Sequence, residues 1–392
     1  MKKIFQKQKS VQKRRRDRRL CARRLRKAIA KKRRRLENNK RTIVKRIVTK
    51  RVLNLPSEIT LRNKLTRSAL LRFISSMHKK AKELNRLSLE NTQLIFDFKA
   101  VQKMYSDGTL LLLAEIKNAR KIYQNISTFL CKPSRNNRTK QVIYQVGFGE
   151  ALEGVEPVSI TRRDVYQWKV ASGTKIDGDI CSEVISRCLE AAANDGIDIA
   201  LSPLYEAASE AMANACEHAY IKELDFEPDR RSVAFSEEAW WMFTSYDEGY
   251  ISVVFCDLGH GIPKTISIKS PGIWDRLKTA FKRENADDLS KAPGLNDAEI
   301  IEGILTDQKT RTLKEGRGQG LLQNIWLFVE HIDRKADVAI MSNKGECLHV
   351  KSRNKPSRQI TINHTTSING TLITWRIPVD QKKVQYERIR DI

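Results

Sequence analysis

Three polar side chains recur at four-residue intervals in the segment EAMANACEH, which runs from Glu210 to His218. In an α-helix, Glu210, Asn214 and His218 lie on one face, one turn apart. A carboxylate such as that of Glu210 accepts a proton from water, and the amide oxygen of Asn214 is a hard ligand of the kind that Mg²⁺ binds. Taken alone, the pattern is more typical of an ordinary amphipathic helix whose polar face meets solvent.

An aspartate and two glycines follow an apolar run in YISVVFCDLGHGI, residues 250–262. The run predicts a buried strand that ends at Asp257 in a glycine-rich turn. An ionised aspartate only accepts hydrogen bonds, so Asp257 would suit an amine donor. Gly259 and Gly261 let the backbone of this turn, which closes at Ile262, pass close to a ligand. As a single motif, the aspartate–glycine pattern is also a frequent structural loop.

A second glycine cluster, GRGQG at residues 316–320, precedes a helix-like segment over residues 321–332. A glycine turn that leads into a helix presents free N–H groups and the positive end of the helix dipole to a phosphate. Arg317 would add charge. A flexible hinge fits the segment equally well. A dinucleotide-binding motif does not fit, because the turn does not follow a strand in a βαβ unit.

A fourth segment, GTLITWRIP, opens a C-terminal strand with Gly370 and Thr371. In this order, and within about 170 residues, the four segments resemble the N, G1, G2 and GT boxes of the gyrase/Hsp90/histidine-kinase/MutL (GHKL) ATPases. The resemblance implies ATP and Mg²⁺ as cofactors. It implies that Glu210 acts as general base or orients the attacking water and that Asn214 binds magnesium. It also implies that Asp257 and Thr371 lie at the adenine. The remaining positions that match nucleotide-contacting residues are His218, Gly259, Gly261, Ile262, Gly316, Arg317, Gly318, Gly320 and Leu321.

These motifs need a scaffold of helices and strands. A helix over residues 203–220 should carry the first motif, with Ser202 as its N-cap, and a helix over 181–195 should begin the same domain. Residues 337–343 and 346–350 predict a hairpin. The resemblance implies a two-layer α/β sandwich, the Bergerat ATP-binding fold, over residues 180–380. Within it, residues 263–315 would form a lid over the triphosphate.

A smaller α/β pattern precedes this domain. Its expected elements are a strand at 93–101, a turn at 105–108, a helix at 109–121, a strand at 126–131 and a helix at 136–146. Residues 91–170 thus resemble a STAS-type domain, the fold of anti-sigma-factor antagonists, although a generic α/β module also fits. In the regulated antagonists a phosphorylatable Ser or Thr precedes the turn glycine, whereas Asp107 precedes Gly108 here. We therefore do not expect phosphorylation in cis, and Ser106 is the nearest hydroxyl.

The positive charge of the chain is concentrated at one end. Residues 1–51 hold 25 Lys and Arg but only Asp17 and Glu37, a net charge of +23, whereas the other 341 residues hold 48 basic and 44 acidic side chains. Like charges at this density predict a disordered tail or a conditional helix. Such a segment would contact the phosphate backbone of RNA or DNA. A solvated tail, or one that touches anionic lipid, is the alternative.

Between the tail and the STAS-like module, residues 52–90 predict a helical linker. Seven scattered cysteines without metal-like spacing indicate reduced thiols. No run approaches the length of a membrane span, and the N-terminus lacks a secretory signal. We expect a soluble, cytoplasmic protein without a membrane span.

Little sequence follows the last motif, which argues against the transducer domain of gyrase, MutL and Hsp90. His78 lacks the setting of a kinase phosphoacceptor and is expected on a helix surface. The first hypothesis is a regulatory protein that binds and hydrolyses Mg-ATP as a conformational switch, coupled to the STAS-like module and the tail. The second is a serine/threonine kinase of anti-sigma-factor type acting on a protein partner. The third is a nucleic-acid-binding protein that uses ATP as a structural ligand.

Overall fold

The computed structural model describes residues 27–32, 48–87, 91–194, 197, 199–221, 224, 240–247, 250–284, 294–311, 321–332, 334–352 and 355–379. The chain forms two compact units, residues 1–48 and 49–392. In the first unit, residues 27–32 are an exposed helical segment. The rest of the predicted basic tail up to residue 47 lies outside the described residues.

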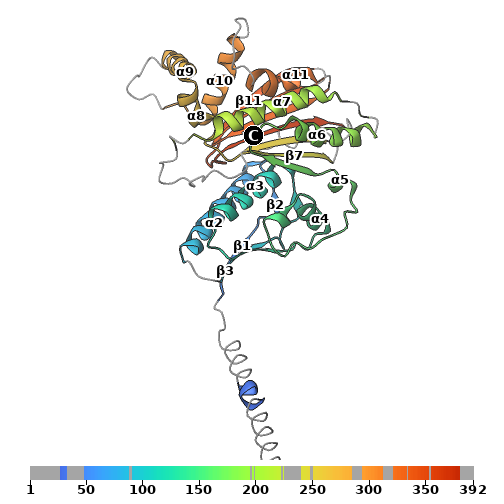
Figure 1. Cartoon of the computed structure of the whole chain (residues 1–392). Helices are drawn as coiled ribbons and strands as arrows, with labels where there is room; N and C mark the ends of the chain where they lie inside the picture. The colour runs from blue at the N-terminus through green and yellow to red at the C-terminus, as the bar shows by residue number, and fades with distance from the viewer. Residues whose placement is uncertain are drawn as a thin grey trace, which may run out of the picture. The chain divides into compact units, whose positions relative to one another are not determined.

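A small parallel sheet opens the second unit (Figure 1). Its strands are β1 (Thr49–Asn54), β3 (Thr92–Asp97) and β5 (Thr128–Lys132), in the order β1-β3-β5. Two short strands, β2 (Glu58–Ile59) and β4 (Lys103–Met104), pair beside it. The helices of this part are α2 (Lys64–Arg86), α3 (Ser106–Ile122), α4 (Asn137–Gln145), the single turn η1 (Phe148–Glu150) and α5 (Arg163–Tyr166).

The predicted strand–helix–strand–helix order is confirmed here, but the prediction of a turn at 105–108 was wrong, because residues 106–108 form the first turn of α3, and β1 was not predicted. This strand crosses the boundary at residue 51 between the expected tail and the expected helical linker. The prediction that the linker is helical from residue 52 was therefore wrong at its start. Leu53 is buried, and the β1 backbone pairs in parallel with β3 from Thr49↔Thr92 to Asn54↔Asp97. Pairing with β3 thus decides the conformation of residues 49–54, whose charged side chains interrupt the apolar alternation typical of a strand.

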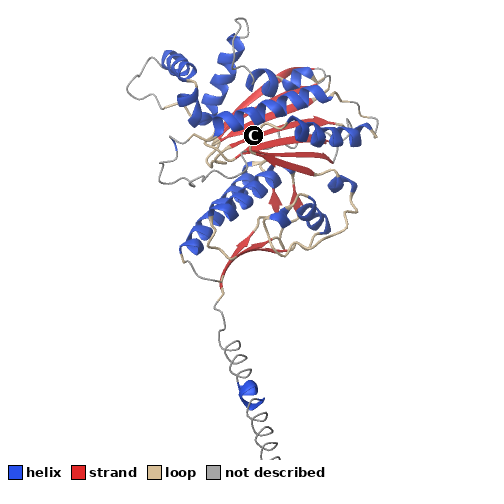
Figure 2. Cartoon of the chain, viewed as in Figure 1, coloured by secondary structure: helices blue, strands red, loops and turns tan. Residues whose placement is uncertain are grey.

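A seven-stranded sheet follows, and every neighbouring pair in it is antiparallel (Figure 2). The strand order is β11-β10-β9-β12-β8-β7-β6. In chain order the strands are β6 (Lys169–Gly173), β7 (Trp240–Asp247), β8 (Tyr250–Asp257), β9 (Ala336–Ser342), β10 (Gly345–Ser352), β11 (Lys355–Asn363) and β12 (Thr371–Pro378). The hairpin of β9 and β10 and the strands after residues 250 and 370 confirm the predictions.

One face of this sheet is covered by helices of the same region. They are α6 (Gly178–Ala193), α7 (Leu201–Asn214), the π-helical turn η2 (Ala215–Ala219), the π-helical turn η4 (Leu321–Trp326) and α11 (Phe328–His331). Three further helices adjoin one end: α8 (Ile262–Lys269), α9 (Pro271–Glu284) and α10 (Asp297–Arg311). The predicted helix over 321–332 is thus divided into a π-helical turn and a short α-helix.

Alternating residues of the central strands enter two different hydrophobic cores. On β8, Val253 and Phe255 pack with the covering helices, whereas Val254 and Cys256 pack with helix α3 and the parallel sheet. This alternation is the period of two that a strand imposes. Antiparallel sheets commonly leave one face in water. In this sheet, α3 covers the second face.

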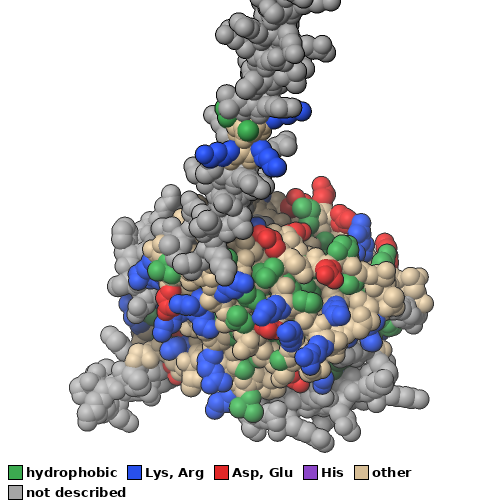
Figure 3. All heavy atoms as spheres, turned by 90° about the horizontal axis from the view of Figure 1, so that it is seen from below, with side chains coloured by type: hydrophobic (Ala, Val, Ile, Leu, Met, Phe, Trp, Pro, Cys, Tyr) green, Lys and Arg blue, Asp and Glu red, His purple; other side chains and the backbone are tan. Residues whose placement is uncertain are grey.

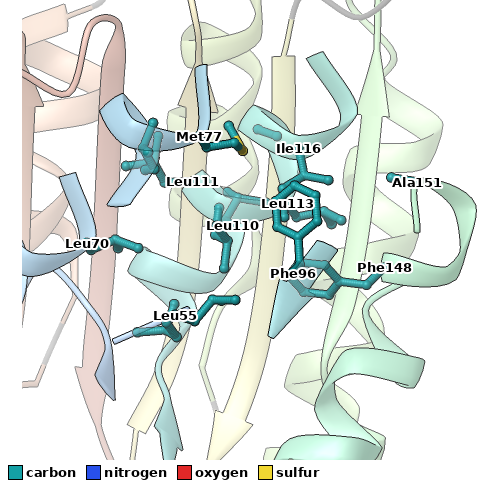
Figure 4. Packing of buried hydrophobic residues seen from close by; sticks show 14 of the residues in the cluster. Leu55, Leu70, Met77, Phe96, Leu110, Leu111, Leu113, Ile116, Phe148 and Ala151 are labelled. Carbon is teal, nitrogen blue, oxygen red and sulfur yellow. The ribbon is translucent and has the colours of Figure 1, made fainter. Parts of the chain in front are cut away.

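Helix α3 contains four consecutive leucines, residues 110–113, all of which are buried. A helix that is apolar on all sides is a buried helix. Figure 4 shows Leu110, Leu111 and Leu113 packed with Phe96 of β3, and the same core includes Phe243 of β7. The two regions predicted as separate domains, 91–170 and 180–380, therefore share one hydrophobic core.

The architecture is mixed α/β, as predicted. None of the described helices combines the length and the apolar character that crossing a membrane requires.

Candidate functional site

Three polar side chains form a row at one end of the seven-stranded sheet. Asp257 ends β8, Thr371 begins β12 and Ser342 ends β9. Thr371 is in register with Asp257 on one side and with Ser342 on the other. By the alternation described above, all three occupy the sheet face that α7 covers. The sequence motifs predicted Asp257 and Thr371 as neighbours but missed Ser342.

Hydrogen bonds join the members of this row. Thr371 donates to the Asp257 carboxylate from its backbone N–H and its hydroxyl, and the Gly259 N–H donates to Asp257 Oδ1 over 2.9 Å. Ser342 Oγ lies 3.1 Å from Thr371 Oγ1. Burial nevertheless raises the pKa of Asp257 from 3.8 to about 6, because desolvation outweighs these hydrogen bonds. Keeping this carboxylate ionised therefore costs folding free energy.

The glycine-rich turn after β8 is fixed against the end of the helix that carries Glu210. The His260 N–H donates to the Ala219 carbonyl over 2.7 Å, and the Leu258 N–H donates to the Tyr220 hydroxyl over 3.2 Å. A Cβ at Gly259 would lie 2.3 Å from the Ala219 oxygen. Only glycine permits this approach. Packing against Ala219 therefore requires a glycine at position 259, in addition to the predicted contact with a ligand.

The same turn is held from the other side by the β9–β10 connection. Gly261 adopts φ +79°, and a Cβ there would lie 2.5 Å from Asn343 Nδ2. That amide donates to the His260 carbonyl over 2.9 Å, while the Ile262 N–H donates to Ser342 Oγ over 2.8 Å. Sequence reasoning predicted Asn343 only as the end of a strand and residues 344–345 only as a hairpin turn. The signal it missed was a serine and an asparagine at a strand end, where both could cap a neighbouring turn.

Glu210 and Asn214 lie together on α7, as predicted. Both are half-buried, and Asn214 Nδ2 donates to Glu210 Oε1 over 3.2 Å. The α-helix ends at Asn214, however, and continues as the π-helical turn η2. Its wider i to i+5 spacing breaks the four-residue repeat. The His218 side chain is 48% exposed and lies 3.8 Å from Glu217 Oε2, so it is more exposed than Glu210 and Asn214.

The predicted cap of α7 was also wrong. The helix begins at Leu201 with Ala200 as the capping residue, and Ser202 donates to Glu206 within the first turn. Ser202, the residue directly before the expected start, is inside the helix, because Pro203 occupies the third helical position and not the first.

The glycine cluster Gly316, Arg317, Gly318 and Gly320 lies outside the described residues. Leu321, which follows it, is half-buried. Together with Ile262, Leu321 packs against both the main helix-side core and a small cluster formed by α8, α9 and α10. The structure therefore brings together the residues that border two of the predicted motifs. The predicted lid segment contains these three helices and, in part, residues outside the described ranges.

A buried ion-pair network lies behind the β9–β10 connection. Arg67 of α2 donates from Nη2 to Glu346 Oε2 over 2.7 Å, and His364 Nε2 lies 2.8 Å from the same oxygen. Arg67 Nη1 also lies 2.8 Å from His364 Nδ1. The His364 N–H donates to the Lys344 carbonyl over 2.7 Å. This network links α2 to the turn that fixes the glycine-rich loop.

Two residues of the parallel-sheet part differ from or refine the predictions. His78 is buried, with Nε2 2.8 Å from Glu115 Oε2 and Nδ1 3.2 Å from the Tyr123 hydroxyl, so its prediction as a surface residue was wrong. Asp107 is buried as well and accepts from Thr60 Oγ1 and the Leu61 N–H. Both the neighbouring Ser106 and Asp107 are thus inside the fold.

No cluster of three or more His, Cys, Asp or Glu side chains suited to a metal ion occurs among the described residues. The Asn214 amide and the Glu210 carboxylate are oxygen donors of the type that Mg²⁺ binds.

The chain matches none of the known protein-family models. A search of curated proteins likewise finds no matching relative.

Proposed function

We propose that the seven-stranded region binds Mg-ATP in the manner of the GHKL ATPases and uses it as a conformational switch. The observation that carries the proposal is the in-register row of Ser342, Thr371 and Asp257, closed by a glycine turn that is fixed to the end of α7. A buried carboxylate with a raised pKa at a strand end is typical of functional sites. A ligand that supplies a further donor would offset part of the desolvation cost of this carboxylate.

Asp257 would accept a hydrogen bond from the exocyclic amine of adenine. Its hydrogen bonds to Gly259 and Thr371 already fix the carboxylate in position. The flat base would then lie beside the backbone of the glycine turn. Thr371 and Ser342 extend the polar row away from Asp257.

Glu210 and Asn214 would act at the phosphate end. A bound Mg²⁺ would neutralise phosphate charge there. The Asn214 side chain holds the Glu210 carboxylate by their 3.2 Å hydrogen bond, which orients it toward a water as general base. The glycine cluster at 316–320 is proposed to contact phosphate through its backbone N–H groups.

The finer architecture belongs to this proposal. The antiparallel sheet with α6, α7 and α11 on one face is consistent with a Bergerat fold, and the β3–α3–β5 unit is consistent with a STAS-like module. Because α3 packs directly on β7 and β8, movement of the sheet on nucleotide binding would be transmitted to this module. The basic tail is proposed to contact the phosphate backbone of nucleic acid.

The test measures Mg-ATP binding by calorimetry and turnover by phosphate release. Asp257→Asn should weaken binding by about a hundredfold, since it replaces an acceptor by a donor toward adenine. Glu210→Ala should bind ATP with similar affinity and lose turnover by about a hundredfold or more. Asp179→Asn, an exposed carboxylate on α6, is the matched control and should behave as wild type.

Absence of adenine-nucleotide binding in the folded wild-type protein would overturn the proposal. Equal ATP affinity in wild type and Asp257→Asn would also contradict it, because the assigned acceptor would then have no role. Wild-type turnover in Glu210→Ala would remove the base assignment and leave ATP as a ligand only.

A further inference from the structure

The positive charge of this chain does not end with the tail. Residues 49–170, which form the parallel-sheet part, contain 22 Lys and Arg against 10 Asp and Glu, a net charge of +12. Residues 171–392 contain 28 against 34, a net charge of −6. The folded unit is therefore strongly asymmetric in charge, although its overall excess is small.

Helix α2 presents much of this charge on a single face. Its inner side is buried through Leu70, Ile74, Met77, Ala81 and Leu84. Its outer side carries four exposed basic residues, which we call the α2 basic stripe: Arg72, Lys79, Lys82 and Arg86. From the first to the last of them the helix extends roughly 21 Å at 1.5 Å per residue. Figure 3 shows Lys and Arg side chains spread over the face of the molecule seen from below, with fewer Asp and Glu.

The basic stripe is not neutralised from within the described part of the chain. None of its four residues forms an ion pair with a described carboxylate, and the only acidic residue of the helix is Glu83. By contrast, Asp164 in this part is paired with Arg138 and Arg162. Glu83 lies on the same exposed face, so four positive charges and one negative charge leave the face a net charge of +3, which attracts an external polyanion.

The stripe adjoins the strand that directly follows the tail. Lys80 Nζ donates to the Val52 carbonyl of β1 over 3.1 Å, which fixes β1 beside α2. Lys50 and Arg51 on β1 are exposed. Exposed basic residues therefore occur on both β1 and α2, two elements that are in direct contact.

We propose that the α2 basic stripe is a binding surface for a nucleic-acid duplex, contacted through its phosphate backbone. The four cations lie along one side of a single helix, where they can contact successive phosphates of a backbone that runs beside it. The stripe contains no aromatic residue, so it lacks the stacking platforms of single-strand binders. The apolar face of α2 is buried in the core. The helix therefore has no apolar face to insert into a membrane, as interfacial helices do.

The test uses the full chain with its tail, fluorescently labelled RNA and DNA duplexes, and anisotropy titrations over a range of salt concentrations. Lys79→Glu with Lys82→Glu should weaken duplex binding about tenfold or more and reduce the salt slope by about 2. The control, Lys175→Glu with Arg358→Glu, changes the same charge at exposed positions of the seven-stranded region. It should match wild type in affinity and slope.

Three outcomes would overturn the proposal. The first is equal loss in the stripe and control variants, which would show a response to net charge alone. The second is tighter binding of the single strand than of the duplex. The third is binding to phosphatidylserine vesicles that depends on the stripe while duplex binding does not. Mg-ATP affinity, measured on the same variants, should stay at the wild-type value, so failure here is separable from failure of the nucleotide proposal.

Discussion

The two larger sheets of this protein differ in strand direction and in the net charge of the regions to which they belong. The three-stranded sheet is parallel and belongs to a basic region, whereas the seven-stranded sheet is antiparallel and belongs to an acidic one. Sequence composition separates them as if they were independent domains. Helix α3 joins them, because the leucines at 110–113 belong to the same core as Phe96 of one sheet and Phe243 of the other.

The difference shows that a boundary in charge need not be a boundary in packing. The net charge of the exposed side chains can change sign between two regions at little cost in folding free energy, because these side chains remain in water. Because one hydrophobic core spans both regions, each region shields apolar side chains of the other from water. The parallel-sheet part should therefore unfold together with the seven-stranded sheet, and three predictions test this coupling.

The largest expected effect comes from breaking the buried ion-pair network between the regions. Arg67→Met would leave Glu346 buried without its guanidinium partner, which typically costs 3–5 kcal/mol of stability. The measurement is urea unfolding followed by tryptophan fluorescence. Arg67→Met with Glu346→Leu should recover most of the loss, since an apolar pair can replace a buried ion pair. A double variant as unstable as the single one would contradict the ion-pair explanation.

Overpacking the parallel-sheet part should have a somewhat smaller effect. A Cβ at Gly108 would lie 2.5 Å from the Thr60 backbone nitrogen, so Gly108→Ala should destabilise the protein by roughly 3 kcal/mol. Because the core is shared, circular dichroism should show one cooperative transition at a lower temperature. Gly272→Ala, whose Cβ would meet only Arg276 Nη1 at 3.5 Å, an ordinary van der Waals contact, is the control. Two separated transitions would mean that the regions unfold independently.

The smallest effect concerns the buried carboxylate of the seven-stranded region. The pKa of Asp257 is raised, so its ionisation destabilises the fold as pH rises through about 6, and this penalty disappears below pH 3.8. Asp257→Asn should therefore be more stable than wild type by about 1–2 kcal/mol at pH 8 and show no gain at pH 4. Thermal unfolding across this range provides the measurement. A gain that does not vary with pH would show that charge is not its cause.

Much of the fold could be predicted from local patterns. The leucine-rich segment 109–121 was predicted as a helix and the apolar segment 250–257 as a strand. Both predictions are confirmed, because the apolar pattern of each segment is visible in the sequence. Strand β1 could not be predicted, since its pairing with β3 depends on residues about forty positions away. The same holds for Ser342 and Asn343, whose contacts with the glycine turn arise only when β9 lies beside β12.

The candidate site divides in the same way. Asp257 and Thr371 could be predicted to meet because both belong to motifs at strand ends, and the structure pairs them. The π-helical turn over residues 215–219 could not be predicted, because a sequence repeat of four assumes a continuous α-helix.

Strand β1 has a mechanical consequence. Any tension that reaches the fold from residues before Thr49 must enter through this edge strand. Its parallel pairing with β3, from Thr49↔Thr92 to Asn54↔Asp97, means that a pull along the strand strains all the inter-strand hydrogen bonds together. Such a joint resists sliding far better than one that opens bond by bond. β1 would therefore resist a pull applied to the N-terminal segment, and the rest of the fold would stay intact under it.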